Sequence, residues 1–147
     1  INNVAFGALS LRSNTTASSN TAFGFATLYN NTTGSSNTAI GRNALSTNTT
    51  GDSNVAIGRA VLYNNTTGIN NLGMGNFALF NNNTGGNNVI IGMQSFINNT
   101  TGNANVSLGN SCLVNNTIGS YNLALGYNSG NNITTGNYNI TIGTNAT

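Results

Sequence analysis

Few side chains in this chain could do chemistry. Its charged groups are Arg12, Arg42, Arg59 and Asp52, Cys112 is the single thiol, and histidine is absent. General acid–base catalysis uses groups that titrate near neutral pH, and a nucleophile needs a base beside it. One carboxylate and one thiol without an imidazole provide neither. We therefore expect no enzymatic activity and no catalytic residues.

The same inventory argues against metal, cofactor and nucleic-acid binding. Calcium sites use several carboxylates, and zinc sites use cysteine and histidine. Nucleic-acid binding needs clustered positive charge, whereas the net charge here is only +2. No apolar run is long enough for a membrane span, so we expect no membrane insertion.

A strict repeat organises the elements of the chain. One glycine series recurs every 17 residues, at Gly7, Gly24, Gly41, Gly58, Gly75, Gly92, Gly109, Gly126 and Gly143. A second series of the same period runs from Gly34 to Gly136, with Ala17 in its first position. Both ends of the chain fall inside a repeat. We expect a single repeat domain over residues 1–147, about eight and a half coils, that forms a segment of a longer fibre.

The pattern within each unit predicts an all-β fold. Val55 and Ile57 alternate with polar or small residues, which is typical of a short strand, and glycine and asparagine follow at turns. We therefore predict a β-solenoid (β-roll) with two short strands per 17-residue coil. Ile57 and Leu62, with their counterparts in other coils, are expected to form the core, and Cys112 is expected to be a small buried filler.

One asparagine position is invariant. Because stacked coils place each residue about 4.8 Å above its copy, equal charges would repel, whereas stacked amides can hydrogen-bond along the rod. We interpret this column as a structural asparagine ladder. Its members are Asn3, Asn20, Asn37, Asn54, Asn71, Asn88, Asn105, Asn122 and Asn139.

A half-apolar stripe follows the core leucines and should point away from them. It alternates with polar residues such as Arg12 and Ser46, and we take it as a candidate subunit interface. Ordinary scattered surface aromatics are the alternative interpretation. The apolar members of this stripe are Tyr29, Tyr63, Phe80, Ile97 and Val114.

The stretches NTAIGRNALSTNTTG and NVAIGRAVLYNNTTG resemble the repeats of phage and viral tail fibres. They are also similar to the shorter head repeats of trimeric autotransporter adhesins of the YadA type. The resemblance covers nearly the whole chain and fades after Gly126, where the core leucine is missing. It implies three β-rolls associated into a fibre.

Our leading hypothesis is therefore a trimeric structural fibre or adhesin segment, extracellular or on a cell or virion surface. Its partners would be copies of itself and a cell-surface receptor or glycan. The alternative is an ice-binding β-solenoid that uses its threonine columns, although adjacent threonines that run into glycine suggest a corner rather than a flat face. One column runs through Thr15, Thr32, Thr49, Thr66, Thr100, Thr117 and Thr134, and the other through Thr16, Thr33, Thr50, Thr67, Thr84, Thr101 and Thr135.

The same segments contain sequons that could accept N-linked glycans in a eukaryotic secretory route. Asparagine-rich turns would produce these sequons without any glycan, and glycans on every coil would crowd at roughly 4.8 Å. The candidate acceptors are Asn14, Asn31, Asn48 and Asn65.

Overall fold

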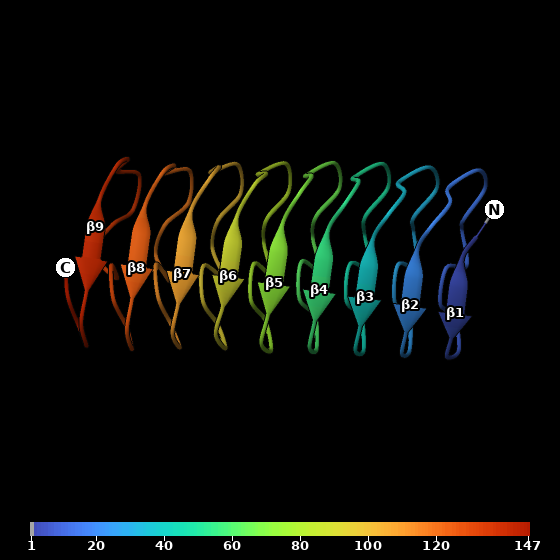
Figure 1. Cartoon of the computed structure of the whole chain (residues 1–147), viewed down its shortest axis with the longest axis horizontal. Coiled ribbons are helices and arrows are strands. Elements are labelled where there is room, and N and C mark those ends of the chain that lie inside the picture. Colours follow the sequence, from blue (N-terminus) through green and yellow to red (C-terminus); the bar gives the residue numbers. More distant parts are fainter. Residues whose placement is uncertain (1) are drawn as a thin grey trace.

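The computed structural model describes residues 2–147 as a stack of β-coils that forms a straight rod (Figure 1). Each coil has one three-residue strand, and this part of the chain contains no helix. The strands are β1 (Val4–Phe6), β2 (Thr21–Phe23), β3 (Thr38–Ile40), β4 (Val55–Ile57), β5 (Leu72–Met74), β6 (Val89–Ile91), β7 (Val106–Leu108), β8 (Leu123–Leu125) and β9 (Ile140–Ile142). The predicted β-solenoid is confirmed.

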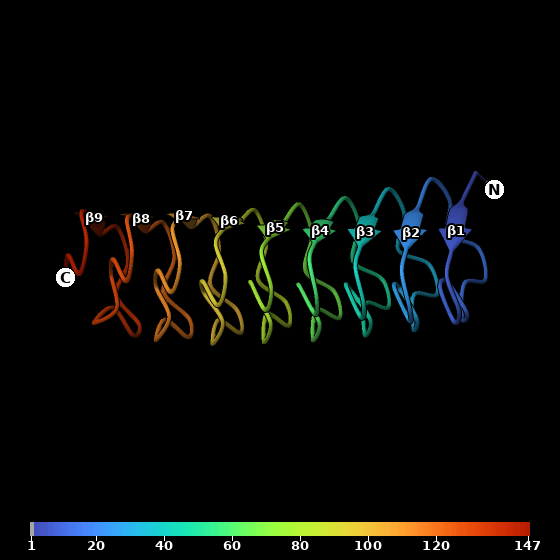
Figure 2. The same ribbon diagram turned by 90° about the horizontal axis from the view of Figure 1, so that it is seen from below.

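The strands form one parallel sheet in sequence order, β1 to β9. Pairing is in register with the repeat, so Ala39 pairs with Ala56 and Ala56 with Gly73. The sheet occupies one side of the rod, and the rest of each coil lies on its other side (Figure 2).

The prediction of two strands per coil is wrong. The segment after the strand is a series of turns, because alternate residues adopt left-handed backbone conformations. Ala60 has φ 53° and Leu62 has φ 52°, values that an extended strand does not allow. The spacing of the apolar residues in this segment indicates which side chains are buried, but it does not indicate a strand.

The assignment of Ile57 to the core is also wrong. In β4 the middle residue, Ala56, is fully buried, whereas Val55 and Ile57 lie on the outer face. The interior is narrow, and Val61 and Leu62 already fill it from the opposite wall. Only a small side chain fits on the inner side of most strands. Alternation identified the two faces of the strand, but the larger residues face outward.

Residues that are twelve positions apart in the sequence face each other across the narrow core. The two members of such a pair are matched in size or in polarity. Gly73 faces Val61, and a Cβ on Gly73 would lie 2.5 Å from a Val61 methyl carbon. Ser95 is hydrogen-bonded to Ser107, and the Ser129 hydroxyl donates to Thr141. In these pairs either a large residue faces a small one or the two hydroxyl groups are hydrogen-bonded to each other.

The predicted asparagine ladder is confirmed. The backbone N–H of Asn54 donates to Asn37 Oδ1 at 2.9 Å, and its Nδ2 donates to the Gly68 carbonyl at 2.8 Å. These side chains are buried from Asn20 to Asn122. A buried amide that is bonded in this way holds successive coils together and leaves no polar atom unpaired.

A second asparagine ladder, which the sequence analysis did not identify, runs parallel to the first. Asn65 Nδ2 donates to Asn48 Oδ1 at 2.8 Å and to the Gly68 carbonyl at 3.0 Å. The two ladders thus share the carbonyls of the second glycine series. A Cβ on Gly51 would lie 2.4 Å from Asn48 Oδ1, so the absence of a side chain at Gly51 gives the ladder amide room, whereas Ala17 occupies this position in the first coil. The column contains Asn14, Asn31, Asn48, Asn65, Asn82, Asn99 and Asn116, and its side-chain hydrogen bonds link Asn14 through to Asn99.

The second ladder ends where the core changes. Gly130 replaces the core leucine, and Ile133 replaces the next ladder asparagine. Ile133 packs against the core, and its Cδ1 lies 3.4 Å from where a Cβ on Gly130 would be. Isoleucine therefore fills the space that the missing leucine leaves, and Asn116 has neither amide atom hydrogen-bonded.

Candidate functional site

The outer face of the sheet is an apolar surface that runs along the rod. The first and last residue of every strand point outward, and all but Thr21 and Thr38 are apolar. Phe6 is 65% exposed, Phe23 and Leu108 are 52% exposed, and Phe6 stacks on Phe23 with 4.8 Å between ring centroids. We call this surface the sheet face: Val4, Phe6, Thr21, Phe23, Thr38, Ile40, Val55, Ile57, Leu72, Met74, Val89, Ile91, Val106, Leu108, Leu123, Leu125, Ile140 and Ile142.

A solvent-exposed apolar face is unusual for a parallel sheet, because such sheets are normally covered on both faces. The rod is on the order of 40 Å long and the strands about 10 Å. In projection the face therefore covers on the order of 400 Å². That area is comparable with the roughly 300–600 Å² of the largest patch on a typical monomer, a kind of patch that is often functional.

Two arginines border the carboxyl ends of the strands. Arg42 follows β3 and Arg59 follows β4 in the next coil, so the two occupy the same column. Arg42 lies over Phe25 at 5.9 Å, and Arg59 lies over Phe77 at 5.1 Å. The aromatic rings hold both guanidinium groups at this border, which we call the arginine edge.

The single carboxylate lies at the opposite border. Asp52 comes before β4, and its Oδ1 accepts a hydrogen bond from the Ser35 backbone N–H at 2.6 Å. Asp52 is exposed, as are Arg42 and Arg59. Within one chain the sheet therefore separates the carboxylate from the two arginines. We call the border at which Asp52 lies the acidic edge.

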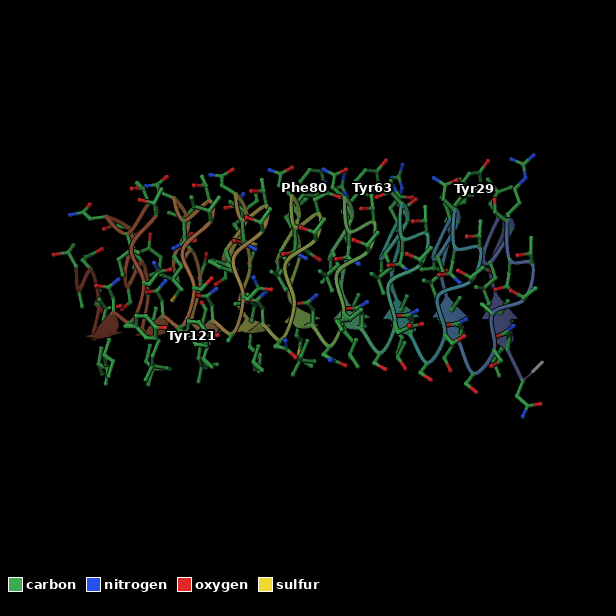
Figure 3. The ribbon with its side chains drawn as sticks, turned by 90° about the horizontal axis from the view of Figure 1, so that it is seen from above. Tyr29, Tyr63, Phe80 and Tyr121 are labelled. Carbon is green, nitrogen blue, oxygen red and sulfur yellow. The ribbon has the colours of Figure 1, made fainter. Side chains whose placement is uncertain are left out.

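The candidate interface stripe lies on the side of the rod away from the sheet (Figure 3). Its apolar members are only partly exposed, and Tyr63 stacks on Phe80 at 5.2 Å between centroids. Arg12 lies over the Tyr29 ring at 5.4 Å. These contacts run along the rod, so the stripe covers part of its own surface. Tyr121, in contrast, lies on the sheet side of the rod (Figure 3).

The candidate glycan acceptors belong to the second asparagine ladder. Asn31, Asn48 and Asn65 are fully buried, and their Nδ2 atoms donate inside the coil. Asn14 is partly buried, and its Nδ2 donates to the Ala17 carbonyl at 3.3 Å. A glycan on Nδ2 of the three buried residues has no room in the folded coil.

The threonine columns lie in a bend of each coil rather than on a strand. In the first column the hydroxyls are engaged by the backbone, since Thr32 Oγ1 donates to the Thr49 carbonyl at 3.0 Å. In the second column, Thr33, Thr50 and Thr67 are exposed. The two columns therefore present one row of outward hydroxyls at a corner.

Other kinds of site are not found in the described part of the chain. Residues 2–147 contain no group of three or more His, Cys, Asp or Glu side chains that could hold a metal, and their surface has no pocket. None of their elements is a helix able to cross a membrane. Cys112 is fully buried, as the sequence predicts for a small filler.

No protein-family model, curated protein or solved structure matches this chain. Its function must therefore be inferred from its own geometry, in which the sheet face and its two charged edges are the most distinctive surface.

Proposed function

We propose that this chain is a structural segment of an extracellular or virion-surface fibre or adhesin, which assembles as a parallel homotrimer. The observation that carries the proposal is the exposed apolar face of a parallel sheet. The resemblance of the repeats to trimeric fibre proteins favours three copies. The asparagine- and threonine-rich corners would remain outside and meet a receptor or glycan.

The chemistry of the chain supports a mechanical role. Its sequence offers one carboxylate and no histidine for catalysis, while repeated amide ladders and an in-register sheet give a regular rod. Assembly around the sheet face would bury the apolar columns of every coil, which adds to the burial that a thin core of alanine and leucine provides. Length and regularity are then the useful properties of the molecule.

The mass of the purified protein in solution tests this proposal. We expect light scattering and native mass spectrometry to give three times the chain mass of 15.0 kDa. Ile57→Asp places a charge on the sheet face and should convert the trimer to monomer, whereas Thr67→Asp, at an exposed corner, should leave the mass unchanged. A monomeric wild-type protein at tens of micromolar would overturn the proposal.

Ice binding is the weaker alternative. It needs a flat row of outward hydroxyls two columns wide on a strand, but the threonines lie in a bend and one column bonds to the backbone. We expect no thermal hysteresis from the wild-type protein, and a measurable effect that Thr50→Val and Thr67→Val abolish would favour the alternative.

A further inference from the structure

The two charged edges of the sheet specify how copies of this chain would fit together. Asp52 lies between Arg42 and Arg59 in sequence, and each coil advances the chain by one strand spacing, about 4.8 Å. Its position along the rod axis is therefore between those of the two arginines, but at the opposite edge of the sheet. Within the chain, this arrangement keeps the charges of opposite sign apart.

Rotation about an axis parallel to the rod brings these edges together. If the sheet faces of several copies turn toward such an axis, the acidic edge of each copy meets the arginine edge of its neighbour at the same height. Each Asp52 then lies between Arg42 and Arg59 of the next copy. This holds for any closed ring of parallel copies without an axial shift. An antiparallel arrangement of two rods aligned over their full length places the arginines opposite coils that lack a carboxylate.

Three tyrosines near the C-terminal end repeat this relation. Tyr127 occupies the column of Arg42 and Arg59, while Tyr121 and Tyr138 lie at the acidic edge, one column from Asp52. All three are more than half exposed, and Tyr121 stacks on Tyr138 with 5.0 Å between centroids. In sequence Tyr127 lies between Tyr121 and Tyr138. The same rotation therefore brings Tyr127 against that pair on the neighbouring copy.

We infer that the sheet face binds a second copy of this chain, parallel and in register, and that Asp52 sets the register by pairing with Arg42 and Arg59 of that copy. The inference rests on the proposed homotrimer and adds its interface, direction and register. The apolar columns run through every coil from β1 to β9, so every coil contributes to the contact. A shift by one coil leaves each Asp52 beside one arginine at most.

Charge reversal tests the pairing. Asp52→Arg alone, and Arg42→Asp with Arg59→Asp, each place like charges together and should weaken assembly at least tenfold, as measured by native mass spectrometry across a dilution series. The combination of all three substitutions restores opposite charges and should recover most of the wild-type affinity. Arg12→Asp, on the side away from the sheet, is the control and should have no effect. A combined variant that assembles no better than its parts would overturn the inference.

Cross-linking tests the register directly. In a Cys112→Ser background, Asp52→Cys with Arg59→Cys should give a covalent trimer on oxidation, because these positions are on opposite edges of one chain and adjacent between copies. Asp52→Cys with Arg12→Cys is the control and should stay uncross-linked. A stable wild-type oligomer without this cross-link indicates an antiparallel or shifted arrangement and overturns this inference alone. A monomeric wild-type protein overturns it together with the proposed function.

Discussion

At the scale of single residues, buried asparagine amides provide the polar contacts between coils that charged groups provide in many other proteins. Asn20 and Asn31, one from each ladder, donate to the same Gly34 carbonyl, at 2.9 Å and 2.8 Å. Because both amides are buried and bonded, each contributes to stability mainly by leaving no donor unpaired. The glycine at the meeting point leaves room for both amides, since a Cβ on Gly34 would lie 2.6 Å from Asn31 Oδ1.

Adjacent asparagines allow this role to be measured. Asn31→Ala removes a fully buried amide together with its hydrogen bonds to Asn14 Oδ1, the Gly34 carbonyl and Asn48 Nδ2. We expect it to lower the free energy of unfolding by about 2–4 kcal/mol, since each buried unpaired polar group costs about 1–3 kcal/mol. The midpoint of thermal unfolding should fall by about 5–15 °C. Asn30→Ala, at an exposed neighbouring position, should change it by less than about 2 °C, and equal effects would contradict the ladder's role.

At the scale of the coil, the pairs across the core explain why an irregular sequence keeps a regular backbone. Gly73 and Val61 form one such pair, and Ala78 and Ile90 stand at the same separation in the next coil with the large residue on the other wall. In both pairs a large residue on one wall faces a small residue on the other, so either wall can carry the larger side chain. Close packing of the interior makes this compensation necessary.

A double-mutant cycle tests this compensation. Val61→Ala should create a cavity and Gly73→Ile should overpack the core, each lowering the free energy of unfolding by about 1–3 kcal/mol. The double variant copies the Ala78–Ile90 pair, so we expect it to be more stable than the sum of the single effects by about 1–3 kcal/mol. Chemical denaturation of the four proteins gives the coupling, and strict additivity would contradict the pairing.

The comparison of sequence and structure is clearest at this scale. The 17-residue period, the parallel stacking and the first asparagine ladder follow from residue spacing. In a stack each residue lies next to its own copies, so only residue types that can lie beside the same type recur at one position. The side on which the core lies does not follow, since Val55 and Ile57 alternate equally well with either face inside. What decides it is the width of the coil, which Val61 and Leu62 set from the opposite wall. For the same reason, residue spacing alone does not predict the exposed apolar sheet face.

At the scale of the whole molecule, every coil contacts mainly the coil before and the coil after it. Stability in such a rod is a sum of coil and neighbour contributions. The unit that can be added or removed is therefore one complete repeat and not a strand or a turn.

Deletion of one repeat tests this view. Removal of residues 20–36, a full 17-residue unit, joins Ser19 to Asn37 and leaves every ladder and core column continuous. We expect a folded protein with an unchanged circular-dichroism shape and a thermal midpoint slightly lower than that of the wild type. Removal of residues 20–27 shifts every column above the deletion and should abolish cooperative unfolding. If both deletions behave alike, the coil is not the structural unit.

The difference between the height of a coil and the length of its chain has a mechanical consequence. One coil raises the rod by about 4.8 Å, yet its 17 residues span about 55–60 Å when they are fully extended. Tension applied to the two ends would peel coils from the rod one after another, and each release would lengthen the molecule more than tenfold over the height it gives up. If the rod links two bodies, as in the proposed fibre, a sudden pull would extend it in small steps and the link between the two bodies would stay intact.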